Sequence, residues 1–555
     1  MAVSGPKGMS MSEKGIRLPA TADEDLTPRS EGLMLAVDPA LGAAAATRLA
    51  RRVIAETLPG DWAVERLAHA GGLYQALRRQ PSLQPLVRGV WDLARRADAH
   101  PDVVWAEAAV IQPGHDPDPG RVGRRGPRSG GRSRPLPCSA APEWSLDNTR
   151  LPEAFDLVDG PPGGGIVVAH PDTGYTIHPE IRDPRRLAVG LGHDFEAGRR
   201  DPRDPLRGRS PGHGTATASV IMSARGDEGN AEGGDGSGVS GAAPAATLVP
   251  LRVSSGVVHF SFRRLALAID HAIGIDCDII SMSLGGPFAS RSLEQVLGAA
   301  AANGILGLAA AGNVWPWVVH PARLAGVVAV AASNCRDGIW RHSAAGEAVD
   351  IAAPGQDVWR ALAEPRGRYT EARSSGTSYA VATVAGAAAL WLARHGRERL
   401  RRSYPGAALP AAFRQLLTGA GARRPPGWDT ARHGAGILDA VGLVTAALPR
   451  RGPSAARPPS AAGINTPAEL THFFPARDAD DVEATLARLA GSKADMSAYL
   501  TRYGDELRFH LATSPAFRAA LMRRGPRAAR RPSGAVQQHL ARYASPELRE
   551  ALPPL

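Results

Sequence analysis

The chain is poor in cysteine, lysine and aromatic residues. Its 555 residues include three cysteines, and aromatic side chains make up 5%. Cys138, Cys277 and Cys335 lie far apart and show no C-x-x-C spacing, which excludes a disulfide-rich scaffold and a cysteine-ligated zinc site. We expect Cys277, beside a predicted strand, to be a small core residue.

Long hydrophobic runs are also lacking. The longest nearly apolar stretch, Ala380 to Ala393, is shorter than the roughly 20 residues that a transmembrane helix needs. The first 30 residues contain no apolar core flanked by basic residues, so no Sec-type signal peptide is recognised. These observations predict a soluble protein and favour the cytoplasm, with non-classical export left open.

The basic charge of the chain is almost entirely arginine. The net charge is +11 and the pI is about 10.1, values that a nucleic-acid-binding protein would have. However, only Lys7, Lys14 and Lys493 are lysines among the 65 basic residues, which indicates a coding-composition effect. Basic residues also gather in linkers rather than on a helix face, so we expect no nucleic-acid partner.

Composition divides the chain into six segments. Residues 113–142 and 448–464 are rich in arginine, glycine and proline and are interpreted as linkers, because such sequences cannot form a packed core. The first linker would contain any processing site. The other segments are a flexible N-terminus (1–32), a small α+β unit (33–112), a central domain (143–447) and a small helical domain of unknown role (465–555).

Short patterns predict the elements of the two outer units. The α+β unit would have a strand at Leu33–Val37, helices near Ala43–Glu56 and Leu86–Ala97, and a closing strand at Val103–Val110. In the C-terminal domain, apolar residues recur at helical spacing. That spacing predicts two amphipathic helices, one from Val482 to Leu489 and one from Met496 to Leu511.

The central domain alternates short apolar runs with helical runs. This pattern predicts an α/β fold in which a parallel sheet is covered by helices on both faces. In such sheets, active sites lie at the carboxyl ends of strands. The expected strands are Ile166–Ala169, Thr247–Val253, Ile279–Leu284, Ile305–Ala310, Val327–Ala331 and Val349–Ala352, and the expected helices include Phe262–Ile273 and Leu293–Ala302.

Four polar residues occupy chemically suggestive positions in this domain. Asp172 follows the first strand, and His213 stands between two glycines at a helix start. Asn313 ends the strand near Ile305, and Ser378 opens an almost wholly apolar helix, which indicates burial. Each has an ordinary alternative when taken alone: a turn aspartate, a loop histidine, a Gly-Asn turn and a serine N-cap.

Taken together, the order Asp…His…Ser is the one found in subtilisin. The matching strings are Asp172-Thr-Gly174, Gly212-His-Gly-Thr215, Ala310-Ala-Gly-Asn313 and Gly376-Thr-Ser-Tyr-Ala380. The central region resembles the subtilases, the subtilisin-like serine peptidases. Supporting strings are Gly238-Val-Ser-Gly-Ala-Ala-Pro244, Ser281-Met-Ser-Leu-Gly-Gly286, Ala353-Pro-Gly355 and Gly434-Ala-Gly-Ile-Leu-Asp439.

The resemblance implies a serine endopeptidase and a role for each residue. Ser378 would be the nucleophile, His213 the general base and Asp172 the group that orients the imidazole. Asn313, with the backbone N–H of Ser378, would form the oxyanion hole. Two backbone walls would hold an extended polypeptide substrate by strand addition. The walls would be formed by Ser283, Leu284 and Gly285 on one side and by Ala310, Ala311 and Gly312 on the other.

The chain departs from the family pattern at several packing positions. Ala382 and Thr383 replace a proline and a histidine of the nucleophile helix, and Ala216 replaces a second histidine after the Gly-His-Gly-Thr string. His170-Pro171 stands where an aliphatic pair usually precedes the aspartate. Trp315 and Trp317, close to Asn313, either shape the cleft or belong to the core.

The α+β unit at 33–112 resembles the inhibitory propeptide of subtilases, with His100–Glu107 as its last strand. This resemblance implies a self-inhibited precursor that binds its own N-terminal unit and otherwise acts as a monomer. An unrelated docking domain is the alternative. Catalysis would require no cofactor or metal. The acidic loop from Gly226 to Asp235 could hold a structural Ca²⁺, although a solvated loop is the simpler interpretation.

Two other functions are compatible with parts of the sequence. Gly376-Thr-Ser-Tyr-Ala380 approaches the G-x-S-x-G elbow of α/β-hydrolases, but that class needs its acid and histidine after the serine. The second rival is a catalytically weak or dead subtilase fold that serves as a binding or adaptor module. Its basic C-terminal residues Arg523, Arg524, Arg527, Arg530 and Arg531 would then contact an anionic partner.

Overall fold

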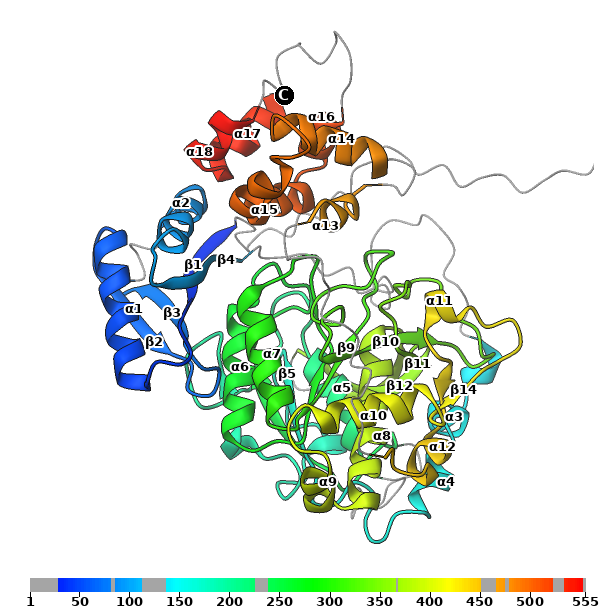
Figure 1. Ribbon diagram of the computed structural model, residues 1–555. Helices are drawn as coiled ribbons and strands as arrows, with labels where there is room; N and C mark the ends of the chain where they lie inside the picture. The colour runs from blue at the N-terminus through cyan, green and yellow to red at the C-terminus, as the bar shows by residue number, and fades with distance from the viewer. Residues whose placement is uncertain are drawn as a thin grey trace, which may run out of the picture.

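The structure is a computed structural model with three groups of secondary-structure elements (Figure 1). It describes residues 28–80, 85–111, 136–224, 238–365, 368–450, 466–474, 479–522 and 534–552. Several segments discussed above lie wholly or mainly outside the described residues: 1–27 of the N-terminus, 112–135 and 451–465 of the two linkers, the acidic loop at 226–235, and the arginine cluster at 523–531.

The N-terminal unit is an antiparallel four-stranded sheet with two helices. Its strand order is β2-β3-β1-β4, with β1 between β3 and β4. The first strand begins at Arg29, inside the segment expected to be a flexible terminus. Sequence patterns also missed the second and third strands. The elements are β1 (Arg29–Val37), α1 (Ala43–Thr57), β2 (Trp62–Arg66), β3 (Leu73–Arg78), α2 (Val87–Asp98) and β4 (Val103–Ile111).

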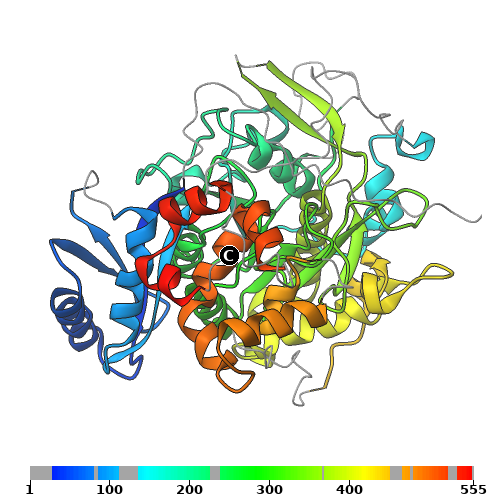
Figure 2. The same ribbon diagram turned by 90° about the horizontal axis from the view of Figure 1, so that it is seen from above.

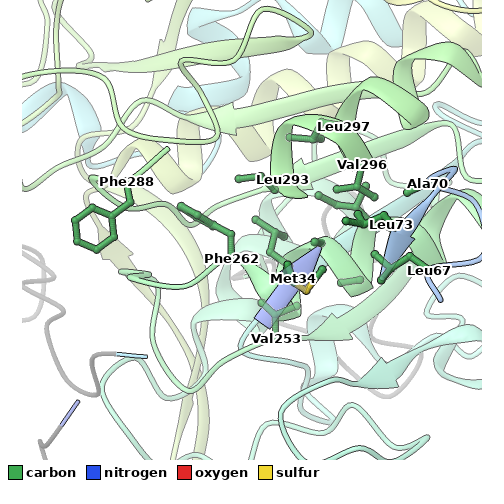
Figure 3. Packing of buried hydrophobic residues seen from close by; sticks show 14 of the residues in the cluster. Met34, Leu67, Ala70, Leu73, Val253, Phe262, Phe288, Leu293, Val296 and Leu297 are labelled. Carbon is green, nitrogen blue, oxygen red and sulfur yellow. The ribbon is translucent and has the colours of Figure 1, made fainter. Parts of the chain in front are cut away.

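This N-terminal unit packs on two helices of the central domain, α6 (Arg263–Gly274) and α7 (Arg291–Ala302). Figure 3 shows Met34 and Leu73 of the unit beside Leu293 and Val296 of α7, within one buried cluster. By burial of apolar area, such contacts stabilise the docked arrangement at roughly 25 cal/mol per Å². The unit and the central domain therefore share a hydrophobic core.

Buried carboxylates supply the polar part of this contact. Asp270 of α6 accepts the backbone N–H groups of Ala68 and His69 at 2.8 and 2.7 Å. Glu107 of β4 accepts the N–H of Arg291 at 2.8 Å and the hydroxyl of Ser292 at 2.5 Å. It thereby satisfies free donors at the start of α7. Burial raises the pKa of the Glu107 carboxyl.

The central domain is built on a nine-stranded sheet among the described residues, in the order β14-β15-β11-β10-β9-β8-β5-β7-β6. All neighbouring strands from β6 to β15 run parallel, and β14 pairs antiparallel with β15. The strands are β5 (Val167–Asp172), β6 (His193–Asp194), β7 (Thr247–Arg252), β8 (Ile279–Met282), β9 (Leu306–Ala310), β10 (Val327–Ser333), β11 (Ile351–Pro354), β14 (Ala422–Arg423) and β15 (Ile437–Leu438).

Helices cover both faces of this sheet, which confirms the α/β expectation. Side chains alternate between two buried clusters: Val168 of β5 packs with α8, and Ala169 packs with α6 and α7. The helix α8 is buried from Thr377 to Leu392. The remaining helices are α3 (Trp144–Asn148), α4 (Leu151–Phe155), α5 (His213–Met222), α8 (Thr377–His395), α9 (Arg397–Ser403), α10 (Ala408–Thr418), α11 (Thr430–His433) and α12 (Ala440–Thr445).

A separate antiparallel hairpin, β12 (Val358–Glu364) and β13 (Arg368–Ser374), leads directly into α8. The hairpin was not among the elements expected from the sequence, although its polar and apolar residues alternate and Pro365 and Gly367 stand between the two strands. β12 packs against α5, the helix that begins with His213. The hairpin therefore supports two helices that carry candidate site residues.

The C-terminal unit is helical, and the two helices expected there are present as α14 and α15. Its helices surround one buried cluster that includes Leu486, Leu500 and Phe517. They lie above the N-terminal unit and the central domain (Figures 1 and 2). The elements are α13 (Pro467–Thr471), α14 (Ala479–Leu489), α15 (Met496–Thr513), α16 (Pro515–Leu521), α17 (Gly534–Tyr543) and α18 (Pro546–Ala551).

One disulfide joins Cys138 to Cys335 across 197 residues of sequence. Their spacing gave no signal for it, because only the fold brings the segment before α3 to the end of β10. Cys277 is free and buried, as expected. In the part of the chain that is described, no helix combines the length and apolarity needed to cross a bilayer.

Candidate active site

The candidate site lies at the carboxyl ends of β5 and β9 and at the first turns of α5 and α8. Asp172 is the last residue of β5 and is buried. His213 opens α5, and its Nδ1 lies 2.8 Å from Oδ1 of Asp172. Burial alone would raise the pKa of the Asp172 carboxyl, but His213, by its charge and its hydrogen bond, holds this pKa below the ordinary value. The pair is therefore arranged for an ionised carboxylate that orients the imidazole.

A threonine and a second aspartate hold these two elements together. The hydroxyl of Thr173 donates to Oδ2 of Asp204 at 2.7 Å and accepts the backbone N–H of Gly214 at 3.0 Å. Asp204 Oδ2 also accepts the N–H of Gly212 at 2.8 Å. Sequence reasoning missed Asp204, because an aspartate in a loop of Asp, Pro and Arg carries no distinguishing pattern.

Gly214 is required by the close approach of α5 to the turn after Asp172. A Cβ at this position would lie 2.1 Å from the carbonyl oxygen of Gly174. Any side chain there would push α5 away from the end of β5. Gly212, on the other side of the histidine, has a φ of +75°, and a Cβ there would lie 2.7 Å from the carbonyl oxygen of Ala363. Backbone contacts therefore explain both glycines of the Gly-His-Gly string.

Ser378 and Asn313 come together at the start of α8. Ser378 lies in the first turn of this helix, where the helix dipole favours negative charge. The side-chain oxygen of Asn313 accepts from the N–H and the hydroxyl of Thr377, at 2.9 and 2.7 Å. Because Thr377 occupies the amide oxygen, the amide nitrogen of Asn313 is turned toward the backbone beside Ser378.

Two donors approach one region beside Gly376. A Cβ built on Gly376 would lie 3.5 Å from Nδ2 of Asn313 and 3.7 Å from the backbone nitrogen of Ser378. These are the groups that a two-donor oxyanion hole requires. The hydroxyl of Ser378 donates to the carbonyl oxygen of Ser283 at 3.2 Å.

The wall formed by Ser283, Leu284 and Gly285 is already paired within the chain. Gly285 donates its N–H to the carbonyl oxygen of Val257 at 2.9 Å and accepts the N–H of His259 at 2.8 Å. The strand-addition role expected for Gly285 requires free backbone groups. In this structure, the backbone groups of Gly285 are already hydrogen-bonded to the segment Val257–His259.

The backbone groups of the opposite wall, formed by Ala310, Ala311 and Gly312, are also hydrogen-bonded within the chain. Ala311 donates to Val330 and accepts from Val319, each at 2.9 Å, while Gly312 accepts from Ala344 at 2.8 Å. Ala310 lies in β9 and is hydrogen-bonded within the sheet. Of the six wall residues, Ser283 contacts Ser378 directly. Gly285, Ala311 and Gly312 have backbone groups that are already hydrogen-bonded within the chain.

Trp315 and Trp317 follow Asn313 and are half-buried, with ring centroids 6.3 Å apart. Trp317 contacts Phe473 of the C-terminal unit, with a centroid separation of 6.0 Å. Neither of the two alternatives expected from sequence, cleft or core, includes this contact between domains. No cluster of three or more metal-ligating side chains occurs among the described residues.

Comparison with known proteins assigns the family. The model of the subtilase family, Peptidase_S8, matches residues 163–431. Subtilisin Savinase of Lederbergia lenta is 32% identical over 248 residues, which cover 44% of this chain and 82% of that protein.

This chain belongs to the subtilase family. Thermitase of Thermoactinomyces vulgaris is 30% identical over 263 residues, covering 47% of this chain and 85% of that protein. An alkaline protease of Shouchella clausii is 32% identical over 44% of this chain and 58% of its own length. The fold and the family expected from the motifs are therefore confirmed, and the family is one of serine peptidases.

Solved subtilase-like structures also match. The crystal structure of MycP1 with the N-terminal propeptide removed is 26% identical, with a TM-score of 0.43, and the match covers 56% of this chain and 99% of that one. A protease of Pseudoalteromonas arctica PAMC 21717 is 27% identical, with a TM-score of 0.42 and coverage of 53% and 93%.

Proposed function

We propose that this subtilase is a serine endopeptidase that hydrolyses peptide bonds in polypeptides. Ser378 would attack the carbonyl carbon, and His213 would take its proton and return it to the leaving amine. Asp172 would keep the imidazole in the required tautomer. The observation that carries the proposal is the 2.8 Å contact of His213 Nδ1 with the buried Asp172 carboxylate, beside the helix start that holds Ser378.

Asn313 and the N–H of Ser378 would stabilise the oxyanion of the tetrahedral intermediate. Support comes from the two hydrogen bonds of Thr377 to the Asn313 oxygen, which fix the orientation of the amide. No metal or cofactor takes part in the proposed reaction. Of the six residues of the two walls, Gly285 would bind substrate by strand addition only after the Val257–His259 segment has separated from it.

We further infer that the chain is made as a self-inhibited precursor. The N-terminal unit would be the inhibitor, because it shares a buried core with α6 and α7 and binds them through Asp270 and Glu107. Cleavage within the linker at 113–142 would begin activation. A weak or dead peptidase that acts as an adaptor is the second candidate, and the pairing of Gly285 with Val257 and His259 favours it over a fully active free form.

The Cys138–Cys335 disulfide bears on where the protein acts. Disulfides persist in oxidising compartments and are rare in the cytoplasm. The bond therefore favours an extracytoplasmic location over the cytoplasmic one indicated by the N-terminal sequence.

The deciding experiment compares the intact masses of wild type and Ser378→Ala after the same incubation. We expect wild type alone to lose about 110–140 N-terminal residues, since linker cleavage would need the nucleophile. A serine-reactive fluorophosphonate, added to both proteins, separates the candidates further. Labelling of wild type without cleavage would retain the peptidase and reject autoprocessing, whereas no labelling would favour the adaptor.

A further inference from the structure

The C-terminal unit contacts both other units, and its contacts with the N-terminal unit centre on Arg95 of α2. The guanidinium donates to Glu506 at 2.8 Å, to Glu547 at 2.9 Å and to Ser545 at 2.7 Å. All three acceptors belong to the C-terminal unit, and Asp92 is the partner on α2 itself. Arg95 therefore binds in a polar site on the C-terminal helices, called the Arg95 socket below, which is formed by Glu506, Ser545 and Glu547.

The socket is built around a buried charge. The side chain of Glu506 is 1% exposed, and Ser545 donates to it through its backbone N–H at 2.6 Å and its hydroxyl at 2.9 Å. A buried carboxylate is costly unless it is paired and hydrogen-bonded. Arg95 supplies the cation that pairs with this carboxylate across the two units. The ion pair between Arg95 and Glu506 therefore contributes most to stability while the two units stay in contact.

Aromatic packing lies beside the ionic contact. The rings of Trp91 and Phe509 have centroids 5.7 Å apart, and both side chains are buried. Phe509 belongs to the same hydrophobic cluster as the interface between the N-terminal unit and the central domain. A cavity of about 40 Å³ there is lined by Met34 and Trp91, by Phe260 and Phe288, and by Phe509, so all three units meet at this point.

The other end of the C-terminal unit is attached to the central domain. His472 and Phe473 lie against Trp317, with centroid separations of 5.6 and 6.0 Å, and Arg323 contacts His472 at 3.3 Å. Trp317 lies four residues after Asn313. In both views the C-terminal helices extend over the N-terminal unit and the central domain (Figures 1 and 2).

We propose that the C-terminal helical unit is an internal clamp that holds the N-terminal unit on the peptidase domain after the linker between them has been cut. This inference rests on the proposed function, in which the N-terminal unit is the inhibitor, and it assigns the C-terminal domain a role. Linker cleavage alone would leave the inhibitor bound. Activation would then also require that the Arg95 socket opens.

The test measures release of the N-terminal fragment without using the protein's own activity. The full chain carries Ser378→Ala, a C-terminal affinity tag and a recognition sequence for an added site-specific protease within residues 113–135. After cleavage on the resin, the N-terminal fragment that appears in the supernatant is followed over time. Failure of the proposed hydrolysis would leave this measurement intact, so the two proposals are tested separately.

Two variants approach the socket from opposite sides. Arg95→Met removes the cation that the N-terminal unit supplies to Glu506, while His510 of the C-terminal unit stays 3.6 Å from that carboxylate. Glu506→Gln removes the buried one of the two C-terminal carboxylates that pair with Arg95. Because breaking a buried ion pair is strongly destabilising, we expect each to speed release by about 30-fold or more. The double variant should release no faster than the faster single variant, since both remove one interaction.

Arg52→Met is the matched control, because Arg52 pairs with Asp102 inside the N-terminal unit. It should release the fragment at the wild-type rate. The clamp is rejected if Arg95→Met and Glu506→Gln both release the N-terminal fragment at the rate of the protein in which Arg95 and Glu506 are unchanged. It is also rejected if that unchanged protein releases the fragment as fast as Arg95→Met does. Faster release in Arg95→Met alone would indicate a folding defect of α2 and reject the clamp.

Discussion

The hydroxyl of Thr217 donates to Oδ2 of Asp172 at 3.3 Å, on the side of the carboxylate opposite His213. The same hydroxyl lies 3.0 Å from Nε2 of His170, which is buried and whose pKa is lowered by that burial. His170 Nε2 also lies 3.8 Å from Oδ2 of Asp172, so the departure from the aliphatic pattern reaches the candidate triad both directly and through this hydroxyl group. Sequence reasoning had expected it to affect packing alone.

Thr217→Val should lower kcat/KM by about tenfold, since a hydrogen bond to a charged group contributes roughly 1.5–3 kcal/mol. It should also shift the acid limb of the pH profile upward. With one donor fewer, the Asp172 carboxylate would hold the His213 proton more strongly. Steady-state kinetics between pH 5 and 9 check both effects.

The control for that change is Thr383→Val, which removes a buried hydroxyl bonded to the carbonyl oxygen of Tyr379. Its acid limb should match that of wild type. An equal shift in both variants would mean that Thr217 acts through general packing rather than through Asp172.

Asn313→Ala should reduce kcat by about a hundredfold to a thousandfold with little change in KM, as expected for loss of one oxyanion donor. Thr377→Val should produce a smaller loss, because the Asn313 amide would lose one of the two bonds that orient it. Asn303→Ala, at the end of α7, serves as the control. A rise in KM with unchanged kcat in Asn313→Ala would assign this residue to ground-state binding.

Peptide length should matter little while Val257 and His259 remain bonded to Gly285. We expect a single-residue ester and a four-residue peptide ester of the same acyl residue to give kcat/KM values within about threefold on the full chain. The longer substrate has no free strand edge to join. A hundredfold preference for it would show that the segment opens readily. After removal of the N-terminal unit, the ratio should rise.

Acid should destabilise the fold through His178, which is fully buried beside α5. Its Nδ1 accepts the N–H of Glu180 and its Nε2–H donates to the carbonyl oxygen of Thr370, each at 3.2 Å. The bond from Glu180 needs the neutral ring, because a protonated Nδ1 cannot accept. Burial lowers its pKa to about 4. Because an exposed histidine in the unfolded chain titrates near 6.5, stability is complete above about pH 6.5 and declines as the pH falls toward 4.

The decline from this group should reach about 3 kcal/mol and then level off below pH 4. Urea unfolding of Ser378→Ala at several pH values measures it without self-digestion. His178→Asn, which keeps an acceptor for Glu180 but does not titrate, should flatten the profile between pH 6.5 and 4. An unchanged slope in that variant would assign the acid sensitivity to other groups.

The sequence predicted the candidate site residues that stand beside a glycine required by the backbone or at the end of a buried strand. Gly214 and Gly376 frame His213 and Ser378, and Asp172 stands where a buried strand ends, so local patterns suffice. Asp204 and Thr217 were missed because they act through side-chain contacts between loops and helices that have no fixed spacing. Pairing of Gly285 with Val257 and His259 was missed for a related reason: a single bridge between two loops has no hydrophobic period.

The outer units follow the same rule. Long amphipathic helices such as Met496–Thr513 were predictable, whereas the short strand Trp62–Arg66 carries too few residues to show alternation. The socket for Arg95 could not be predicted, because Glu506 lies more than 400 residues away in sequence and only tertiary packing brings the two together.

Because of the disulfide, the two chain ends created by cleavage of the first linker would be attached to the central domain in different ways. Cys138 lies just after residues 112–135 and is bonded to Cys335 at the end of β10. A cut anywhere in that stretch creates a new chain start whose nearby residues stay covalently fastened to the sheet. The fragment before the cut keeps no covalent bond, and noncovalent contacts alone hold it. After such a cut the peptidase domain would begin with a covalently anchored end, while the N-terminal unit, the proposed inhibitor, would become a separate molecule.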